Sequence, residues 1–195
     1  MKNLGESYEV FIPIIGTYNI YNTLAALAVC NKLKVEIKDI VEALPQIKLP
    51  SMRFEILETN ALTIINDAYN ANPASMAAAL ETFSKMNVEG KRIFVCGDML
   101  ELGWYALEAH RNIGKLVNYS SINYLITFGE LAEEVRKSAI NDGLNKNQAK
   151  SFDTTDEIVD FLAAIANKGD AILIKGSRAK GMERIVDGLR KKMNS

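Results

Sequence analysis

The stretch Ile64-Ile65-Asn66-Asp67-Ala68-Tyr69-Asn70-Ala71-Asn72-Pro73 decides the fold of this chain. The apolar run Leu62–Ile65 predicts a short buried strand that leads directly to the carboxylate of Asp67. Asn72 is a natural N-cap, and Pro73 suits the first turn of a helix. The apolar face of that helix is predicted to carry Met76, Leu80 and Phe83. Ligands of open α/β sheets bind where a strand ends and a helix begins, so this loop is a candidate site. A well-capped connection without any ligand explains the local pattern equally well.

Strands and helices are predicted to alternate from Arg53 to the end of the chain. The predicted strands are Phe54–Glu58, Leu62–Ile65, Arg92–Cys96, Tyr124–Thr127, Ala149–Phe152 and Ala171–Ile174. The predicted helices are Pro73–Met86, Ala106–Asn118, Glu130–Ala139, one that starts at a capping box of Thr154 and Glu157, and Met182–Lys192. The first two strands form a hairpin around Thr59-Asn60-Ala61 or lie as neighbours. Alternation with short links favours the α/β class, with a Rossmann-like, mostly parallel sheet and helices on both faces.

The residues before this regular region have a different pattern. Val10–Ile15 predicts an edge strand because Pro13 interrupts it, and helices are expected at Asn19–Leu33 and Ile37–Leu44. Pro45–Pro50 is interpreted as a linker. One strand and two helices are too little for a core of their own, which favours the tail of a larger domain. An N-terminal helical embellishment is the alternative.

Composition excludes several classes of function. The chain has 195 residues, is 48% hydrophobic and 24% charged, and carries a net charge of −1. Nucleic acid is therefore not an expected partner, because a polyanion finds no broad basic face. No apolar run approaches the roughly 20 residues that span a bilayer, so no membrane partner is expected. Cys30 and Cys96 lie in separate apolar runs, which fits a reducing cytoplasm.

Several predicted strands end in residues that carry chemistry. In a parallel sheet these ends share one edge, which places four charged residues together: Asp67, Asp98, Lys175 and Arg178. A mixed set of acids and bases suits a zwitterionic or phosphorylated ligand, although each residue taken alone is more typical of a surface charge near a helix N-terminus. No phosphate loop and no G-x-G-x-x-G is present. His110 is the only histidine and is interpreted as a helix-surface or packing residue, and no metal site is expected.

Five motifs, in register from about residue 10 to the end, resemble the Mur ligase family. They are Gly16-Thr17-Tyr18-Asn19-Ile20-Tyr21-Asn22-Thr23-Leu24-Ala25-Ala26, Met52-Arg53-Phe54-Glu55, Asn66-Asp67-Ala68-Tyr69-Asn70-Ala71-Asn72-Pro73, Gly97-Asp98-Met99-Leu100-Glu101-Leu102-Gly103 and Lys175-Gly176-Ser177-Arg178-Ala179-Lys180-Gly181-Met182-Glu183. The third and fourth motifs point to the family member whose amino substrate is D-Ala-D-Ala.

The resemblance implies a cytoplasmic, ATP-dependent ligase of peptidoglycan synthesis. ATP phosphorylates the terminal carboxylate of UDP-MurNAc-tripeptide, and the amine of D-Ala-D-Ala attacks the acyl phosphate. Family members have a UDP-substrate domain, a central ATPase domain and a C-terminal Rossmann-like domain. By this resemblance, residues 1–49 are the tail of the central ATP-binding domain and residues 50–195 are the C-terminal domain.

The resemblance also assigns four residues to ATP. Asn19 and Asn22 match positions near the adenine, Arg53 matches an arginine that reaches the ATP phosphates, and Asp67 matches the carboxylate that holds the ribose. A guanidinium fork suits phosphate and a carboxylate suits vicinal hydroxyls.

Five further residues are assigned to the amino substrate. Asn70 and Asn72 match residues that line the cleft near the incoming dipeptide, and Lys175, Ser177 and Arg178 match a loop near the same substrate.

The chain departs from the family pattern in two respects. Tyr18 stands where the family usually has histidine. The phosphate loop, the magnesium-binding glutamate and the modified lysine of the central domain are missing, so no catalytic residue is expected here and the Mg²⁺ ligands are expected in the missing domain. The chain alone is therefore expected not to make the ligation product. One alternative is a stand-alone, non-catalytic nucleotide- or peptide-binding module. The other is a sibling Mur or folylpolyglutamate-type ligase, and the third and fourth motifs disfavour this second alternative.

Overall fold

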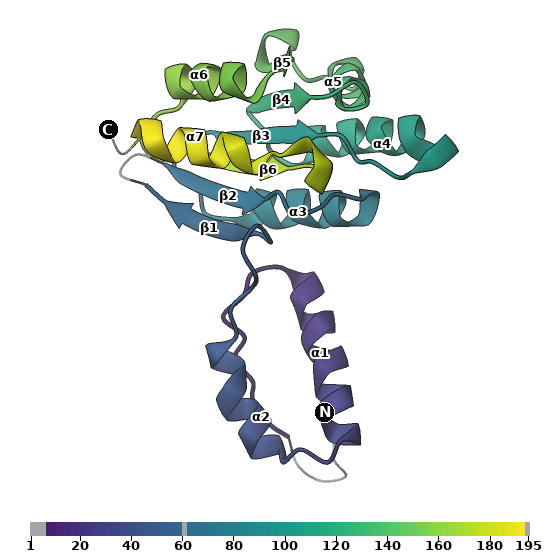
Figure 1. Cartoon of the computed structure of the whole chain (residues 1–195), viewed down its shortest axis with the longest axis vertical. Coiled ribbons are helices and arrows are strands. Elements are labelled where there is room, and N and C mark those ends of the chain that lie inside the picture. The colour runs from purple at the N-terminus through teal and green to yellow at the C-terminus, as the bar shows by residue number, and fades with distance from the viewer. Residues whose placement is uncertain (1–6, 60–61, 194–195) are drawn as a thin grey trace. The chain divides into compact units, whose positions relative to one another are not determined.

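The computed structural model describes residues 7–59 and 62–193, and the chain divides into two compact units, Met1–Leu49 and Pro50–Ser195 (Figure 1). The first unit contains helix α1 (Thr17–Lys32), helix α2 (Ile37–Ala43) and a short 3-10 helix at Leu44–Gln46. Its buried cluster is small and consists of Leu27, Ile40 and Leu44.

The strand predicted at Val10–Ile15 is wrong, since the described residues before α1 form no regular structure. Pro13 has no N–H to donate, and the described part of the first unit holds no other strand that could pair with this segment. The second predicted helix is confirmed as α2, which ends one residue before the predicted end at Leu44, and Pro45 lies inside the 3-10 turn that follows.

The second unit is built on one six-stranded sheet. Its strands are β1 (Glu55–Glu58), β2 (Thr63–Asp67), β3 (Arg92–Gly97), β4 (Tyr124–Phe128), β5 (Ala149–Phe152) and β6 (Ala171–Lys175). The spatial order is β1-β2-β6-β3-β4-β5, and every pair is parallel except the hairpin of β1 and β2. The predicted hairpin is confirmed, although Asn60 and Ala61 of its turn lie outside the described residues.

Helices cover both faces of this sheet (Figure 1). They are α3 (Pro73–Lys85), α4 (Ala106–Tyr119), α5 (Ala132–Asn141), α6 (Thr155–Ile165) and α7 (Glu183–Met193). Residues of α3, α4 and α5 share one apolar cluster with one side of the strands, while α6 and α7 share the cluster on the other side. The prediction of a mostly parallel sheet with helices on both faces is therefore confirmed.

The connection from β2 to α3 forms as the opening stretch predicts. Asn72 is the N-cap of α3, where its side-chain oxygen accepts from the Ser75 N–H at 2.8 Å and Pro73 occupies the first turn. Met76, Leu80 and Phe83 are buried on the sheet side of α3. The strand thus ends and the helix begins within a few residues, which places a polar loop at the carboxyl edge of the sheet.

Candidate functional site

The carboxyl ends of β2, β6 and β3 lie side by side. Asp67 of β2 is opposite Lys175 of β6, and Lys175 is opposite Cys96 of β3. The four charged residues predicted to cluster here do reach this edge, but they form separate pairs. Asp67 pairs with Lys175, Asp98 pairs with Lys180, and Arg178 pairs with Glu183.

Lys175 is buried and acts on the loop that follows β2. Its Nζ lies 2.7 Å from Asp67 Oδ2 and donates to the carbonyl oxygen of Asn70 at 2.9 Å. Only 2% of the residue is exposed. Because both contacts of its ammonium are with the protein itself, Lys175 holds the Asp67 carboxylate and the loop after β2 in place.

The environment of Asp67 has opposing effects on its ionisation. Burial raises the pKa of the Asp67 carboxyl above 3.8, while the Lys175 ammonium, the Phe54 N–H and the Arg53 guanidinium act to lower it. We therefore expect a carboxylate whose charge depends on these contacts.

Arg53 lies in a turn with unusual backbone angles. Met52 and Phe54, the residues on either side of it, have φ values of 61° and 52°. Such angles are rare for residues other than glycine and cluster at functional sites. The Phe54 N–H donates to Asp67 Oδ1 at 3.0 Å, and the exposed Arg53 guanidinium lies 4.0 Å from the centre of the Tyr69 ring.

The other residues predicted to bind the amino substrate differ in their exposure. Ser177 is buried, and its Oγ accepts from the Leu100 N–H at 2.8 Å. Asn72 is exposed but caps α3, while the side-chain oxygen of exposed Asn70 accepts from the Ala71 N–H at 2.9 Å and its NH₂ donates no hydrogen bond to the described residues. Arg178 is half exposed; its Nη1 lies 3.0 Å from Glu183 Oε1.

Arg178 connects this loop to the turn of Arg53, since its Nη1 lies 3.4 Å from the sulfur of Met52. Beside it, Glu183 Oε2 is buried and has no hydrogen-bond partner among the described residues. Arg53, Tyr69, Asp67, Lys175 and Arg178 therefore belong to one connected group on the β2 and β6 side of the edge.

Asn19 and Asn22 belong to the first unit, at the start of α1. Asn19 is buried, and its Nδ2 donates to the carbonyl oxygen of Ile15 at 2.7 Å. The Nδ2 of exposed Asn22 donates to Asn19 Oδ1 at 3.2 Å. The two amides thus form a short hydrogen-bonded row along one helix.

Asp98 connects the loops of three strands. Its Oδ1 accepts from the Ala132 N–H at the start of α5 (2.7 Å), its Oδ2 lies 3.1 Å from Lys180 Nζ, and its carbonyl accepts from the Ser177 N–H (2.9 Å). Gly129 has a φ of 115°, and a Cβ there would lie 2.2 Å from Asp98 Oδ2. Sequence reasoning placed Asp98 at the edge but missed this structural role.

His110 holds the loop after β3, next to Asp98. It is fully buried, its Nε2 accepts from the Met99 N–H at 2.9 Å, and its Nδ1 contacts the carbonyl oxygen of Ala106 at 2.7 Å. These contacts require a neutral ring with the proton on Nδ1. The imidazole therefore has a packing role that holds the loop after β3.

A hollow of about 710 Å³ opens at the ends of β3, β4 and β5. Phe128 and Phe152 line it, and Lys180 lies over the Phe128 ring at 4.8 Å. At its rim Arg136 donates to both oxygens of Glu133 (2.8 and 2.6 Å), which holds the pKa of that carboxyl below its usual value. Parallel strands followed by helices on opposite faces, as β4 and β5 are, leave such a crevice for a ligand.

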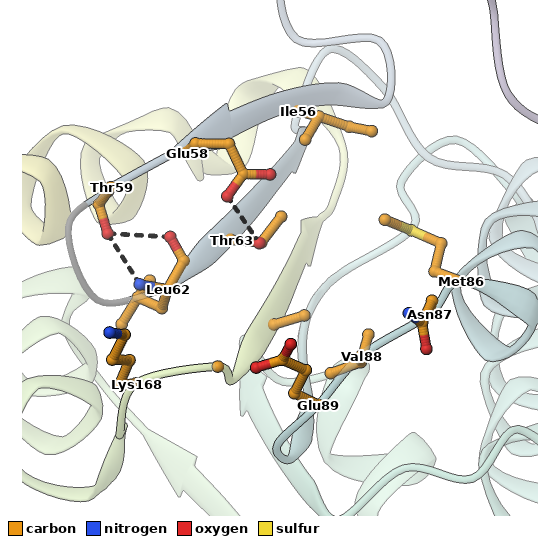
Figure 2. A pocket seen from close by; sticks show the side chains of 12 residues that line it. Ile56, Glu58, Thr59, Leu62, Thr63, Met86, Asn87, Val88, Glu89 and Lys168 are labelled. Carbon is orange, nitrogen blue, oxygen red and sulfur yellow. Dashed lines mark hydrogen bonds between the residues drawn. The ribbon is translucent and has the colours of Figure 1, made fainter.

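A second, smaller hollow of about 360 Å³ lies at the opposite end of the sheet (Figure 2). The hairpin of β1 and β2 borders it, and Glu58 accepts from the Thr63 hydroxyl at 2.9 Å. Glu89 and Lys168 come from two connecting loops on its other sides. The residues predicted to bind ATP and the amino substrate are not among its lining.

Within residues 7–59 and 62–193, no group of three or more His, Cys, Asp or Glu side chains is arranged to hold a metal ion. None of the helices in the described ranges combines the length and apolar character needed to cross a membrane.

The mostly parallel sheet and its charged carboxyl edge define a Rossmann-like domain, a class of fold whose ligands bind at the carboxyl ends of the strands. Residues 52–178 match the family model described as Mur ligase, glutamate ligase domain, and the chain belongs to the Mur ligase family. The predicted resemblance is thereby confirmed.

The curated relatives are UDP-N-acetylmuramoyl-tripeptide–D-alanyl-D-alanine ligases. The Bacillus subtilis protein is 34% identical over 95% of this chain, and the Escherichia coli protein is 31% identical over 94% of it. The chain spans only about 40% of the length of these relatives.

Solved structures agree with this relationship. MurF from Acinetobacter baumannii superposes with a TM-score of 0.83 at 29% identity, covering 93% of this chain and 40% of that one. MurF from Thermotoga maritima, solved in complex with ADP, gives a TM-score of 0.77 at 26% identity over 91% of this chain and 39% of that one.

Proposed function

We propose that this chain is the C-terminal portion of an ATP-dependent ligase that joins D-Ala-D-Ala to UDP-MurNAc-tripeptide through an acyl phosphate. The observation that carries the proposal is the combination of the match along 95% of the chain with the Bacillus subtilis ligase and the connected group around Arg53 and Asp67. The reaction takes place in the cytoplasm, where ATP is supplied.

In this proposal the β2 and β6 side of the edge receives the nucleotide. Arg53 contacts the ATP phosphates, since its in-plane N–H donors match phosphate oxygens. Asp67 accepts from the ribose hydroxyls, and Lys175 keeps that carboxylate in place. Asn19 and Asn22 are assigned to the adenine, because amide groups match the donors and acceptors of a purine edge.

The amino substrate binds beside the nucleotide. Asn70, Asn72 and Arg178 are exposed and can contact the dipeptide directly, whereas buried Lys175 and Ser177 act by holding the loops. None of these residues lines the hollow bordered by Phe128 and Lys180, so we place D-Ala-D-Ala at the ends of β2 and β6. The mixed charges of Asp67, Lys175 and Arg178 there suit a ligand that carries both an amine and a carboxylate.

Within the described ranges no three His, Cys, Asp or Glu side chains converge as a metal site. As the family resemblance implies, we place the magnesium ligands mainly in the part of the relatives that this chain does not span. When bound there, the ion supplies charge neutralisation at the phosphates.

We assign residues 1–49 to the tail of the central ATP-binding domain. The buried cluster of this unit is small, and α1 exposes large apolar side chains: Ile20 is 52% exposed, Tyr21 74% and Val29 59%. Apolar surface of this kind needs a partner, and the remainder of a central domain would provide one.

A chimaeric enzyme tests the proposal. This chain replaces the segment that it matches, about 40% of the Bacillus subtilis ligase, and mass spectrometry follows the pentapeptide product. We expect product that requires both ATP and D-Ala-D-Ala. Arg53→Ala should lower kcat/KM about 100-fold or more, as removal of a charge-stabilising donor does.

The exposed Arg190 in α7 gives a matched control, and Arg190→Ala should leave the rate unchanged. A folded chimaera that binds ATP but forms no pentapeptide would support a non-catalytic binding module instead. Equal turnover with another amino substrate would favour a sibling ligase.

A further inference from the structure

The turn around Arg53 is held by hydrogen bonds on three sides. The Met52 N–H donates to Glu55 Oε2 at 3.1 Å, and the Phe54 N–H donates to Asp67 Oδ1 at 3.0 Å. The Met52 carbonyl accepts from the Tyr69 N–H at 3.0 Å. Left-handed backbone angles at Met52 and Phe54 persist only where the surroundings over-determine them, as these contacts do.

The residue that closes the turn also contacts the arginine side chain. The Tyr69 ring lies under the Arg53 guanidinium, with 4.0 Å between the guanidinium carbon and the ring centre. Tyr69 belongs to the loop whose position Lys175 fixes through Asp67 and the Asn70 carbonyl. The backbone that carries the ring is therefore anchored to the sheet by contacts that do not involve the Arg53 side chain.

The contact leaves the donors of Arg53 available. Within the described residues, no carboxylate lies within ion-pair distance of its guanidinium and no side-chain acceptor takes its N–H groups. Stacking occupies a face of the planar group, while the N–H bonds point outward in its plane. An anion can thus bind the edge of the guanidinium while the ring keeps the face covered.

We propose that Tyr69 is a positioning residue that orients Arg53 toward the phosphates of a nucleoside triphosphate. The inference rests on the proposed function, because it assumes that Arg53 binds phosphate. An unrestrained arginine side chain samples many rotamers and loses that freedom when it binds. The Tyr69 ring removes part of this loss before the ligand arrives, so binding is tighter.

The test uses the 195-residue chain and inorganic tripolyphosphate as the probe, followed by NMR at the Arg53 Nε–Hε group. In the free protein the ring current of Tyr69 should shift the Arg53 side-chain protons upfield, and Tyr69→Leu should abolish the shift. Tyr69→Leu should weaken tripolyphosphate binding about 2- to 5-fold, the range of an exposed cation–π contact. Tyr69→Phe keeps the ring and should bind as the wild type does.

Two further variants keep the outcomes distinct. Arg53→Lys retains the charge without the planar stack and should weaken tripolyphosphate binding to a similar degree as Tyr69→Leu.

If Arg53→Ala weakens tripolyphosphate binding but Tyr69→Leu does not, the positioning role of Tyr69 is overturned and the phosphate role of Arg53 stands. If Arg53→Ala has no effect, or the wild type does not bind at all, both are overturned. If Tyr69→Phe weakens binding as much as Tyr69→Leu, the ring is not the cause and the inference is again overturned.

Discussion

Asp98 is buried, with 5% of the residue exposed, and its contacts join several loops of the carboxyl edge. It caps α5 through Ala132, pairs with Lys180, and packs against Gly129. The position of Asp98 at the end of a strand predicts a ligand-binding residue. In the structure its carboxylate oxygens instead contact the Ala132 N–H and the Lys180 ammonium.

Replacing Asp98 with alanine should therefore lower the free energy of unfolding by about 3 kcal/mol, because a buried N–H and an ammonium lose their acceptor. Chemical denaturation measures this value directly. Asp187→Ala, on the exposed face of α7, is the control and should cost at most about 0.5 kcal/mol. A loss of less than about 1 kcal/mol for Asp98→Ala would contradict this assignment.

The ionisation of Asp67 gives a second prediction. Burial is the largest influence and raises its pKa above 3.8, while Lys175 is the strongest opposing influence. Between pH 3.8 and the pKa of Asp67 in the folded chain, the folded chain therefore binds more protons than the unfolded chain. In that pH range Asp67 makes the free energy of unfolding fall as the pH rises.

The carboxyl ¹³C shift of Asp67, followed against pH, should titrate with a midpoint above 3.8. Lys175→Met should raise the midpoint further, because it removes the nearest positive charge. Lys192→Met, which removes an ammonium paired with Asp160, should leave the Asp67 midpoint unchanged. A wild-type midpoint at or below 3.8 would show that the ion pair outweighs burial.

At the residue scale, the sequence predicted which charged residues lie at the carboxyl edge of the sheet, but not which of them form ion pairs. Chain order placed Asp67, Asp98 and Lys175 at strand ends, and parallel geometry brings such ends together. The partners could not be predicted, because Lys180 reaches Asp98 only through the conformation of the loop after β6. The contact of Tyr69 with Arg53 likewise depends on the hairpin that brings the two segments together.

At the element scale, local chemistry predicted the helices well. The predicted capping box of Thr154 and Glu157 forms at α6, and Asn72 is the N-cap of α3 as predicted. The structure adds that Ser75 completes a second capping box at α3. The strand expected at Val10–Ile15 failed because a strand needs a partner, and pairing is not a local property.

Asn72 has two proposed roles, which substitution can separate. Asn72→Ala should destabilise the chain by about 1 kcal/mol because α3 loses its cap, and Asn72→Ser should recover most of that loss. Thermal and chemical unfolding provide the measurement. In the chimaeric ligase, a rise in KM for D-Ala-D-Ala with Asn72→Ser would indicate that the amide also contacts the substrate. Equal destabilisation by alanine and serine would argue against the capping role.

At the scale of the whole molecule, the class of fold followed from alternation, but the strand order did not. β6 enters between β2 and β3, and this crossover brings Lys175 beside Asp67. Hydrophobic patterns identify buried strands without saying which neighbours they take. The family motifs were needed to connect the edge with a nucleotide.

The chain by itself should have no ligase activity. It spans about 40% of the length of its curated relatives, and its sequence contains no phosphate loop. An enzyme-linked ADP-release assay with UDP-MurNAc-tripeptide, D-Ala-D-Ala, ATP and Mg²⁺ should give the rate of a protein-free control. Turnover above that control would contradict the account.

The central claim is that the β2 and β6 side of the carboxyl edge is part of a nucleotide site. Backbone amide shifts of the isolated chain, followed by NMR during a titration with ATP, test it most directly. We predict weak, saturable shifts, with affinity weaker than micromolar, at residues 52–54, 66–70 and 175–178. The amides around the opposite hollow, such as those of Asn87 and Lys168, should not move (Figure 2). Absence of shifts at the carboxyl edge, or shifts confined to the opposite hollow, would contradict the claim.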